Sequence, residues 1–133
     1  MSDHSATETI LCIADDDGVG YQRSLLEKGY TVLAAASAQQ GLQIVAGSKV
    51  AAVIVDYHMP EVDGHEIAIE IKRLKPNTPI VMVSSDEEVP DHVLKVVDAF
   101  VPKHLAPTRL VPVLTRICDE VLAKLAERAK LSG

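Results

Sequence analysis

The sequence predicts a single α/β domain in which helices cover both faces of a parallel sheet. Five short apolar runs recur along the 133 residues, and they are continuously apolar, as strands buried on both faces require. Segments with apolar residues at helical spacing separate these runs. Because strand and helix alternate with short connections, the crossovers must be right-handed, and they produce a (βα)5 doubly wound parallel sheet.

The expected strands are the apolar runs at residues 10–14, 31–35, 51–55, 79–83 and 99–101, of which the last is the weakest. Three helices are predicted by apolar residues three or four positions apart: Leu42, Val45 and Ala46 after a cap at Ser37, then Ile67, Ile71 and Leu74, then Val93, Val96 and Val97.

The last helix is predicted by an amphipathic stripe that consists of Leu110, Leu114, Ile117, Val121 and Leu125. Pro112 disturbs this stripe, because a proline inside a helix removes a hydrogen bond and clashes with the preceding turn. In a helix that began at Pro107, Pro112 would lie five residues inside. We therefore expect a kink at Pro112 or a helix that begins nearer residue 110.

Composition and charge exclude several classes of protein. With 47% hydrophobic and 24% charged residues and no apolar run of membrane-spanning length, the chain is expected to be soluble and globular, without membrane insertion. The net charge is −6 and the basic residues are scattered, so we expect no direct binding to nucleic acid. The polar N-terminus lacks a secretory signal, which predicts a cytoplasmic protein. Cys12 and Cys118 are interpreted as small core residues that remain thiols.

One domain accounts for nearly the whole chain. We assign residues 1–8 to a flexible N-terminal tail, residues 9–126 to the domain and residues 127–133 to a C-terminal tail.

Charged and hydroxyl side chains follow four of the predicted strands at the points where these strands end. They are Asp15, Asp16 and Asp17 after the first strand, Asp56 after the third, Ser84 and Ser85 after the fourth, and Lys103 after the fifth. The carboxyl ends of parallel strands share one edge of the sheet, where doubly wound folds bind ligands. Carboxylates from neighbouring strands repel each other unless a hard cation neutralises them, and such oxygen ligands suit Mg²⁺. A lysine and a serine there can hold phosphoryl oxygens, and an aspartate can accept a phosphoryl group.

Helix capping or solvation would account for any one of these acidic residues, for example Asp17 before Gly18 or Asp86 before Glu87. Capping explains neither the adjacent Asp16 nor a lysine at the far strand of the same edge. Their convergence therefore predicts a functional cluster.

Four segments carry a resemblance to the receiver domain of two-component response regulators: Ile10–Asp16, Val53–Gly64, Pro79–Ser84 and Phe100–Lys103. The stretch from Asp56 to Gly64, with Met-Pro inside it and Asp-Gly at its end, is the most specific. The resemblance covers almost the whole chain and implies a flavodoxin-like sheet with the strand order 2-1-3-4-5. It also implies a CheY-like signalling domain of a phosphorelay, which is not an enzyme beyond its own phosphotransfer and dephosphorylation.

The resemblance assigns a role to each residue of the cluster. It implies that Asp56 accepts a phosphoryl group from a sensor histidine kinase or a phosphotransfer protein. The Mg²⁺ ligands would be Asp15, Asp16, Asp56 and the backbone carbonyl of His58. Lys103 would pair with the phosphoryl oxygens, and Ser84 would move to bond them.

The same resemblance places an aromatic switch residue at Phe100, the only phenylalanine of the chain. If its ring turns inward after phosphorylation, the face formed by the helix near 86–97, the strand near 99–101 and the last helix changes. We expect this face to carry the output, by binding a downstream protein or by homodimerisation. The alternative is that Phe100 is a permanently buried core residue.

Three features depart from the family pattern. The segment from Asp16 to Gly29 is roughly one helical turn shorter and contains Gly18 and Gly20, each of which costs a helix about 1 kcal/mol, so we expect a short, frayed or displaced first helix. Lys103 is followed by histidine where the family has proline after a cis peptide, so this bond is either trans with a rearranged loop or cis with strain. The third departure is the pair of prolines at positions 102 and 112.

Two other interpretations stay open. Ile13–Gly18 also resembles the Asp-x-Asp-Gly loop of haloacid-dehalogenase-type phosphatases, in which Asp15 would attack phosphate and Asp17 would be the acid. That interpretation lacks a late acidic pair and a cap insertion, and it leaves the stretch from Asp56 to Gly64 unexplained. The other interpretation is a pseudo-receiver, an interaction module that keeps the fold and is never phosphorylated.

Overall fold

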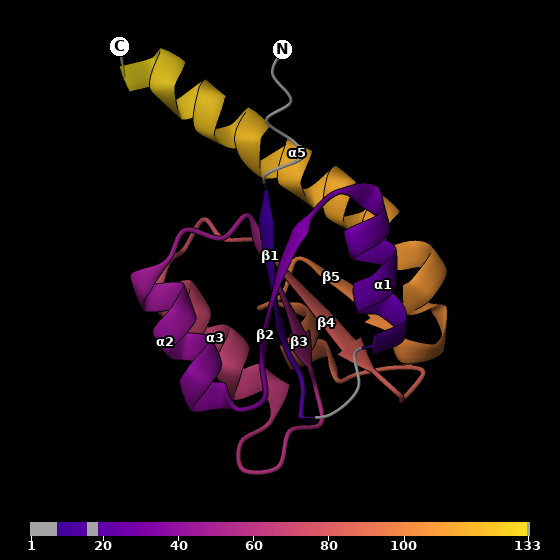
Figure 1. Ribbon diagram of the computed structural model, residues 1–133. Helices are drawn as coiled ribbons and strands as arrows, with labels where there is room; N and C mark the ends of the chain where they lie inside the picture. The colour runs from indigo at the N-terminus through magenta and orange to yellow at the C-terminus, as the bar shows by residue number, and fades with distance from the viewer. Residues whose placement is uncertain (1–7, 16–18, 133) are drawn as a thin grey trace.

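The computed structural model describes residues 8–15 and 19–132 and contains a five-stranded parallel sheet (Figure 1). The strands are β1 (Thr9–Ile13), β2 (Thr31–Ala35), β3 (Ala52–Asp56), β4 (Ile80–Ser84) and β5 (Ala99–Pro102). Their order in the sheet is β2-β1-β3-β4-β5. The predicted α/β fold class, strand positions and strand order are therefore confirmed.

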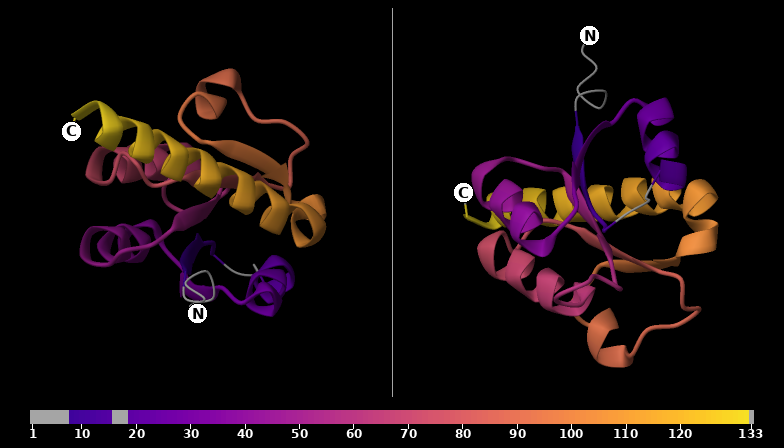
Figure 2. Two further views of the ribbon diagram at one scale, coloured as in Figure 1. Left: turned by 90° about the horizontal axis from the view of Figure 1, so that it is seen from above. Right: turned by 60° about the horizontal axis from the view of Figure 1, so that its bottom comes forward.

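Helices cover both faces of this sheet (Figure 1 and Figure 2). They are α1 (Val19–Lys28), α2 (Ala38–Gly47), α3 (Gly64–Leu74), α4 (Asp91–Leu94) and α5 (Ala106–Ser132), with a 3-10 turn, η2 (Lys103–Leu105), before α5. Residues from α2, α3 and α4 form one hydrophobic core, and residues from α1 and α5 form the other. None of the helices in the described ranges is long and apolar enough to span a membrane.

Alternate residues of each strand supply the two cores. In β1, Leu11 and Ile13 face one core, whereas Ile10 and Cys12 face the other. The sheet buries both of its faces, and this is why the strands are continuously apolar in sequence. Burial raises the pKa of the Cys12 thiol from its ordinary value of 9.0 to about 12, which agrees with a small core residue that stays protonated.

Helix α2 begins where the sequence predicted. The Ser37 hydroxyl accepts a hydrogen bond from the Gln40 amide at 3.2 Å, so the predicted cap is confirmed. Helix α1 has ten residues, as α2 does, and buries Tyr21 and Leu25 in the core it shares with α5. Its described residues thus form a continuous helix that packs against the core, rather than a frayed one. That the helix is shorter than in the family stays a prediction, and Gly18 lies outside the described residues.

Helix α4 corrects a second prediction, because it has only four residues where a helix was expected near 86–97. Pro90 stands at its N-cap, and the residue before a proline disfavours helical backbone, so the helix does not extend toward β4. At the other end, the Asp98 carboxylate accepts hydrogen bonds from the Ile80 amide at 2.7 Å and from Lys72 Nζ at 2.8 Å. These bonds fix the start of β5 beside β4 and leave a turn in place of a longer helix.

Helix α5 decides between the two alternatives for Pro112 and ends later than expected. It begins at Ala106, so a start nearer residue 110 is wrong, and Pro112 lies inside it with its ring exposed. A kink at Pro112 stays a prediction. Pro107 stands in the first turn, where its missing amide hydrogen costs nothing. The helix continues through Ser132, so the segment that we predicted as a C-terminal tail is helical. Its sequence from Glu127 to Lys130 is built of strong helix formers and contains no stop signal.

Candidate functional site

The carboxyl ends of the strands bring most of the predicted cluster to one edge of the sheet. Asp56 is the last residue of β3 and Ser84 is the last residue of β4, whereas Asp15 and Lys103 follow β1 and β5. Since β1 pairs with β3, β3 with β4, and β4 with β5, these residues lie on neighbouring strands. Asp16 and Asp17 lie outside the residues that the structure describes.

Asp56 and Lys103 form the centre of the site. The Asp56 side chain is almost fully buried, and Lys103 Nζ donates to its Oδ2 at 3.0 Å. Its other oxygen, Oδ1, accepts a hydrogen bond from the backbone amide of His58 at 3.2 Å. A buried carboxylate requires such partners, because an unpaired charge is costly to remove from water. Lys103 thus lies against the carboxylate on which the resemblance places the phosphoryl group, and both oxygens of Asp56 are held in a defined orientation.

Ser84 is buried beside this pair and is held by its own loop. Its hydroxyl accepts a hydrogen bond from the Asp86 amide at 3.1 Å. A serine that turned toward a group on Asp56 would have to break this bond, so the conformation of the loop after β4 depends on where the Ser84 hydroxyl points.

Asp15 is the second carboxylate of the candidate site that belongs to the described residues. It follows β1, is exposed, and forms no ion pair with residues of the described part of the chain. Within residues 8–15 and 19–132, no three or more histidine, cysteine, aspartate or glutamate side chains gather as a complete metal site. Of the ligands that the resemblance implied, Asp15, Asp56 and His58 belong to the described residues, and carboxylate and carbonyl oxygens are the donors that Mg²⁺ prefers.

Gly64, which ends the stretch from Asp56 to Gly64, has a steric role at the site. A Cβ on Gly64 would lie 2.6 Å from the carbonyl oxygen of Asp56 and 2.8 Å from Cα of Tyr57. The Gly64 amide donates to the Tyr57 carbonyl at 2.8 Å, and the Asp63 side chain caps α3 by accepting from the Glu66 amide at 3.1 Å. Helix α3 therefore begins in direct contact with the backbone of the candidate acceptor, which only glycine allows.

Sequence reasoning missed two side-chain pairs on the rim of the site. His58 Nε2 and Asp86 Oδ2 are 2.8 Å apart, and His104 Nδ1 and Glu87 Oε2 are 3.8 Å apart. The sequence offered helix capping as a role for Asp86, but the N-cap of α4 is Pro90. Because His58 and Asp86 are 28 positions apart, no local pattern in the sequence indicates their contact.

The structure also shows the peptide bond that follows Lys103 and the position of Phe100 in β5. The peptide bond between Lys103 and His104 is trans, and the chain turns through η2 directly into α5, which is the rearranged-loop alternative. Phe100 lies opposite Met82 of β4 and packs, partly buried, against the core on the side of α4.

Comparison with known proteins agrees with this geometry. Residues 10–115 match the sequence model of the response regulator receiver domain. A CheY-like response regulator receiver domain protein from Methanospirillum hungatei has a TM-score of 0.80 at 24% identity, covering 89% of this chain and 98% of that chain. The response regulator TrrA from Thermotoga maritima, solved in complex with Mg(2+)-BeF, has a TM-score of 0.76 at 23% identity, covering 83% of this chain and 98% of that chain.

One protein with sequence similarity to this chain is much longer than the part that matches. Transcriptional regulatory protein GlrR from Escherichia coli is 33% identical over 88 residues, which are 63% of this chain and 19% of that protein. The matched part of the chain thus spans about a fifth of this relative, and its likeness to the solved structures concerns the fold.

Proposed function

The chain belongs to the response regulator receiver domain family of two-component signalling, and on that basis we propose that Asp56 is its phosphoryl acceptor. The donor would be a sensor histidine kinase or a phosphotransfer protein. A haloacid-dehalogenase-type phosphatase that acts through Asp15 does not agree with the family that residues 10–115 match. The observation that carries the proposal is the contact of the buried Asp56 carboxylate with the partly exposed Lys103, whose Nζ lies 3.0 Å from Oδ2.

The geometry of this pair suits phosphoryl transfer. The bond from a carboxylate oxygen of Asp56 to phosphorus would form while the bond from phosphorus to the nitrogen of the donor histidine breaks. Lys103 would neutralise the oxygens of the transferred group, because its ammonium already lies within hydrogen-bond distance of Asp56. The amide of His58 orients the carboxylate, so little reorganisation is needed when the group arrives.

Mg²⁺ would be held by Asp15, Asp56 and the backbone carbonyl of His58, with Asp16 as a further ligand. Asp15 fits this role because it is exposed and forms no ion pair with the described residues, so its carboxylate is available to a cation. Bound Mg²⁺ would supply positive charge beside the phosphoryl oxygens.

Ser84 and Phe100 would carry the signal away from Asp56. If the Ser84 hydroxyl turns toward a phosphoryl oxygen, the Asp86 amide loses its acceptor and the loop after β4 is released. Phe100 lies one strand further along the sheet and is only partly buried, so it is not the fully enclosed core residue of the alternative interpretation. The expected output surface consists of α4, β5 and α5, where a downstream protein or a second copy would bind. Because α4 has four residues, much of that surface is the turn before β5.

The proposal is tested by intact-mass analysis after incubation with acetyl phosphate. With Mg²⁺ the chain should gain the mass of one phosphoryl group, without Mg²⁺ it should gain little, and Asp56→Asn should gain none. Asp91→Asn is the matched control, because it removes an exposed carboxylate outside the site. An unlabelled wild-type chain would favour the pseudo-receiver, turnover of acetyl phosphate lost in Asp15→Asn would favour the phosphatase, and full labelling of Asp56→Asn would refute the acceptor.

A further inference from the structure

The loop that follows β4, at residues 85–89, is held in place by side-chain contacts. Among the described residues, no backbone-to-backbone hydrogen bond outside the helices and strands involves any of these positions. The loop is anchored at its two ends, where Ser84 and Val89 are buried. Between these anchors lie three exposed acidic residues, Asp86, Glu87 and Glu88. The position of the loop therefore depends on the few contacts that its exposed side chains make.

One of these contacts joins the loop to the loop that follows β3. The ring nitrogen Nε2 of His58 lies 2.8 Å from Oδ2 of Asp86, and the imidazole is the donor because a carboxylate can only accept. The same imidazole meets the ring of Tyr57 edge to face, with the ring centroids 5.0 Å apart. Tyr57 in turn packs against the hydrophobic core. The His58 side chain is thus held from two directions, although it is 56% exposed.

This contact closes a series of hydrogen bonds that runs from the candidate acceptor to Ser84. The His58 amide donates to Asp56 Oδ1 at 3.2 Å, while the His58 imidazole holds the Asp86 carboxylate. The Asp86 amide donates to the Ser84 hydroxyl at 3.1 Å. Ser84 can turn toward a group on Asp56 only if the Asp86 amide loses this acceptor. Because the bond to His58 restrains Asp86, it opposes that turn.

A second histidine reaches the same loop from the other side. His104 follows β5, and its Nδ1 lies 3.8 Å from Oε2 of Glu87. Since β4 lies between β3 and β5 in the sheet, His58 and His104 flank the loop. The contact of His104 is beyond hydrogen-bond distance and is more exposed than that of His58, so it is the weaker of the two. His58 is therefore the main restraint on the loop.

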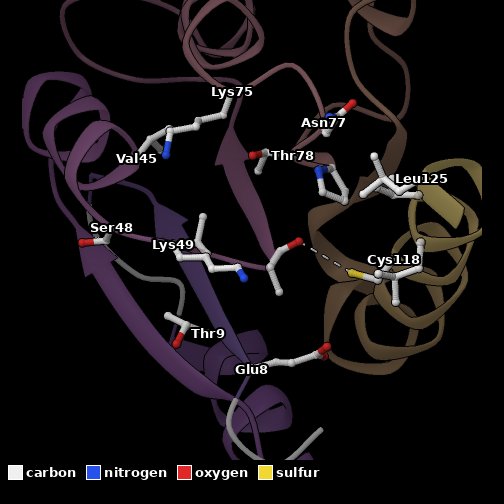
Figure 3. A pocket seen from close by; sticks show the side chains of 15 residues that line it. Glu8, Thr9, Val45, Ser48, Lys49, Lys75, Asn77, Thr78, Cys118 and Leu125 are labelled. Atoms are coloured by element: carbon white, nitrogen blue, oxygen red, sulfur yellow. Dashed lines mark hydrogen bonds between the residues drawn. The ribbon is translucent and has the colours of Figure 1, made fainter. Parts of the chain in front are cut away.

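The groove beneath α5 lies away from this loop. It has a volume of about 590 Å³, and its lining includes Thr9, Ala51 and Pro79 at the amino-terminal ends of strands (Figure 3). The loop follows the carboxyl end of β4, and none of residues 85–89 lines the groove. A molecule in the groove would not touch the loop, so the position of the loop depends on contacts within the chain.

We propose that His58 is a positioning residue, which acts through Asp86 to hold the loop after β4 and to keep the Ser84 hydroxyl turned away from Asp56. This inference rests on the proposed function, because it takes Ser84 to turn toward a phosphoryl group on Asp56. An exposed pair of this kind favours one arrangement by about two- to fivefold. Loss of the imidazole therefore makes the phosphorylated arrangement of the loop easier to reach by that factor.

The first test measures the loop in the unphosphorylated chain, by hydrogen exchange of backbone amides followed by NMR. In His58→Ala the Asp86 amide should exchange about two- to fivefold faster than in the wild type, while the amides of β3 and α3 should not change. The substitution lies 28 positions from Asp86, so it leaves the intrinsic exchange rate of that amide unaltered. It also keeps the backbone amide and carbonyl of residue 58, and circular dichroism checks the fold. An unchanged exchange rate would overturn the proposal.

The second test measures the switch by titration with beryllofluoride in the presence of Mg²⁺, followed at the NMR signal of the Asp86 amide. His58→Ala should bind beryllofluoride about two- to fivefold more tightly than the wild type. His58→Gln should bind as the wild type does, because its side-chain amide can still donate to Asp86. The matched control is His92→Ala, which removes an exposed histidine whose ring packs against His65 instead of the loop. Equal affinity of His58→Ala and the wild type would contradict the proposal.

A double-mutant cycle tests whether His58 acts through Asp86. The variant Asp86→Ala keeps the backbone amide but lacks the carboxylate, so adding His58→Ala to it should change neither the exchange rate nor the affinity for beryllofluoride any further. If the full effect of His58→Ala remained in that background, His58 would act on the site directly and the assignment would be wrong. A wild type that does not bind beryllofluoride would refute the proposed function, whereas the exchange measurement would still decide whether His58 holds the loop.

Discussion

The contact between Gly64 and the backbone of Asp56 predicts the outcome of replacing this glycine with alanine. Ordinary van der Waals contact begins near 3.4 Å, but the added Cβ would lie 2.6 Å from the Asp56 carbonyl oxygen and 2.8 Å from Cα of Tyr57. Both contacts are with backbone atoms, so no side-chain rotation relieves them. The start of α3 must retreat by about 0.8 Å, which weakens the hydrogen bond from the Gly64 amide to the Tyr57 carbonyl.

The expected cost is about 2 kcal/mol of the free energy of unfolding. Overpacking of this kind costs about 1–3 kcal/mol, a lost hydrogen bond about 1 kcal/mol, and alanine returns up to about 1 kcal/mol as a better helix former. Phosphorylation of Asp56 should also slow, because the displaced backbone is the one that carries the acceptor. The matched control is Gly47→Ala at the end of α2, where a Cβ meets nothing within 4 Å, so stability should stay equal or rise slightly.

Urea denaturation followed by circular dichroism measures both variants, and labelling with acetyl phosphate measures the effect on the site. The reasoning is refuted if Gly64→Ala unfolds within about 0.5 kcal/mol of the wild type and is labelled at the same rate. It is also refuted if Gly47→Ala is destabilised as strongly, since the loss would then not arise from the contact with Asp56.

Three further predictions follow from other contacts. Asp98→Asn should lower the free energy of unfolding by about 1–2 kcal/mol in urea denaturation, because the charge that accepts from Lys72 and the Ile80 amide is lost; unchanged stability would contradict this. Stability should fall as pH rises from about 9 toward 11, since both thiols, with their raised pKa values, stay protonated in the folded chain but ionise when unfolded. In a variant with Cys12→Ala and Cys118→Ala, the melting temperature should fall less steeply with pH across this range. An equally steep fall would refute the assignment of the effect to the two thiols. Addition of beryllofluoride and Mg²⁺ should shift the NMR signals of Asp86 and Phe100, whereas shifts confined to the surroundings of Asp56 would exclude the switch.

The strands and the central pair could be predicted from the sequence for physical reasons. A sheet buried on both faces needs continuously apolar strands, and parallel strands deliver the residues after them to one edge. Asp56 and Lys103 could therefore be placed together although they are 47 positions apart. The strand order came from the family resemblance, because apolar periodicity does not distinguish which strands are neighbours.

The lengths of the helices depended on contacts that the sequence does not display. Apolar spacing at Val93, Val96 and Val97 predicted a longer α4, but Val96 lies in the turn that Asp98 holds against β4. In α5 the apolar stripe continues past the sheet, so periodicity could not indicate where burial ends. The side-chain contact between His58 and Asp86 joins two loops, and loop positions carry no periodicity from which a contact could be predicted.

The central claim is that the phosphoryl group is carried by Asp56, and the most direct measurement is its location in the wild-type chain. The chain is phosphorylated with acetyl phosphate and Mg²⁺ and reduced with borohydride, which converts an aspartyl phosphate to homoserine, and the digested peptides are then sequenced by tandem mass spectrometry. Homoserine should replace aspartate at position 56 alone. Homoserine at Asp15, or none at position 56 in a chain that intact mass shows to be phosphorylated, would contradict the assignment of Asp56.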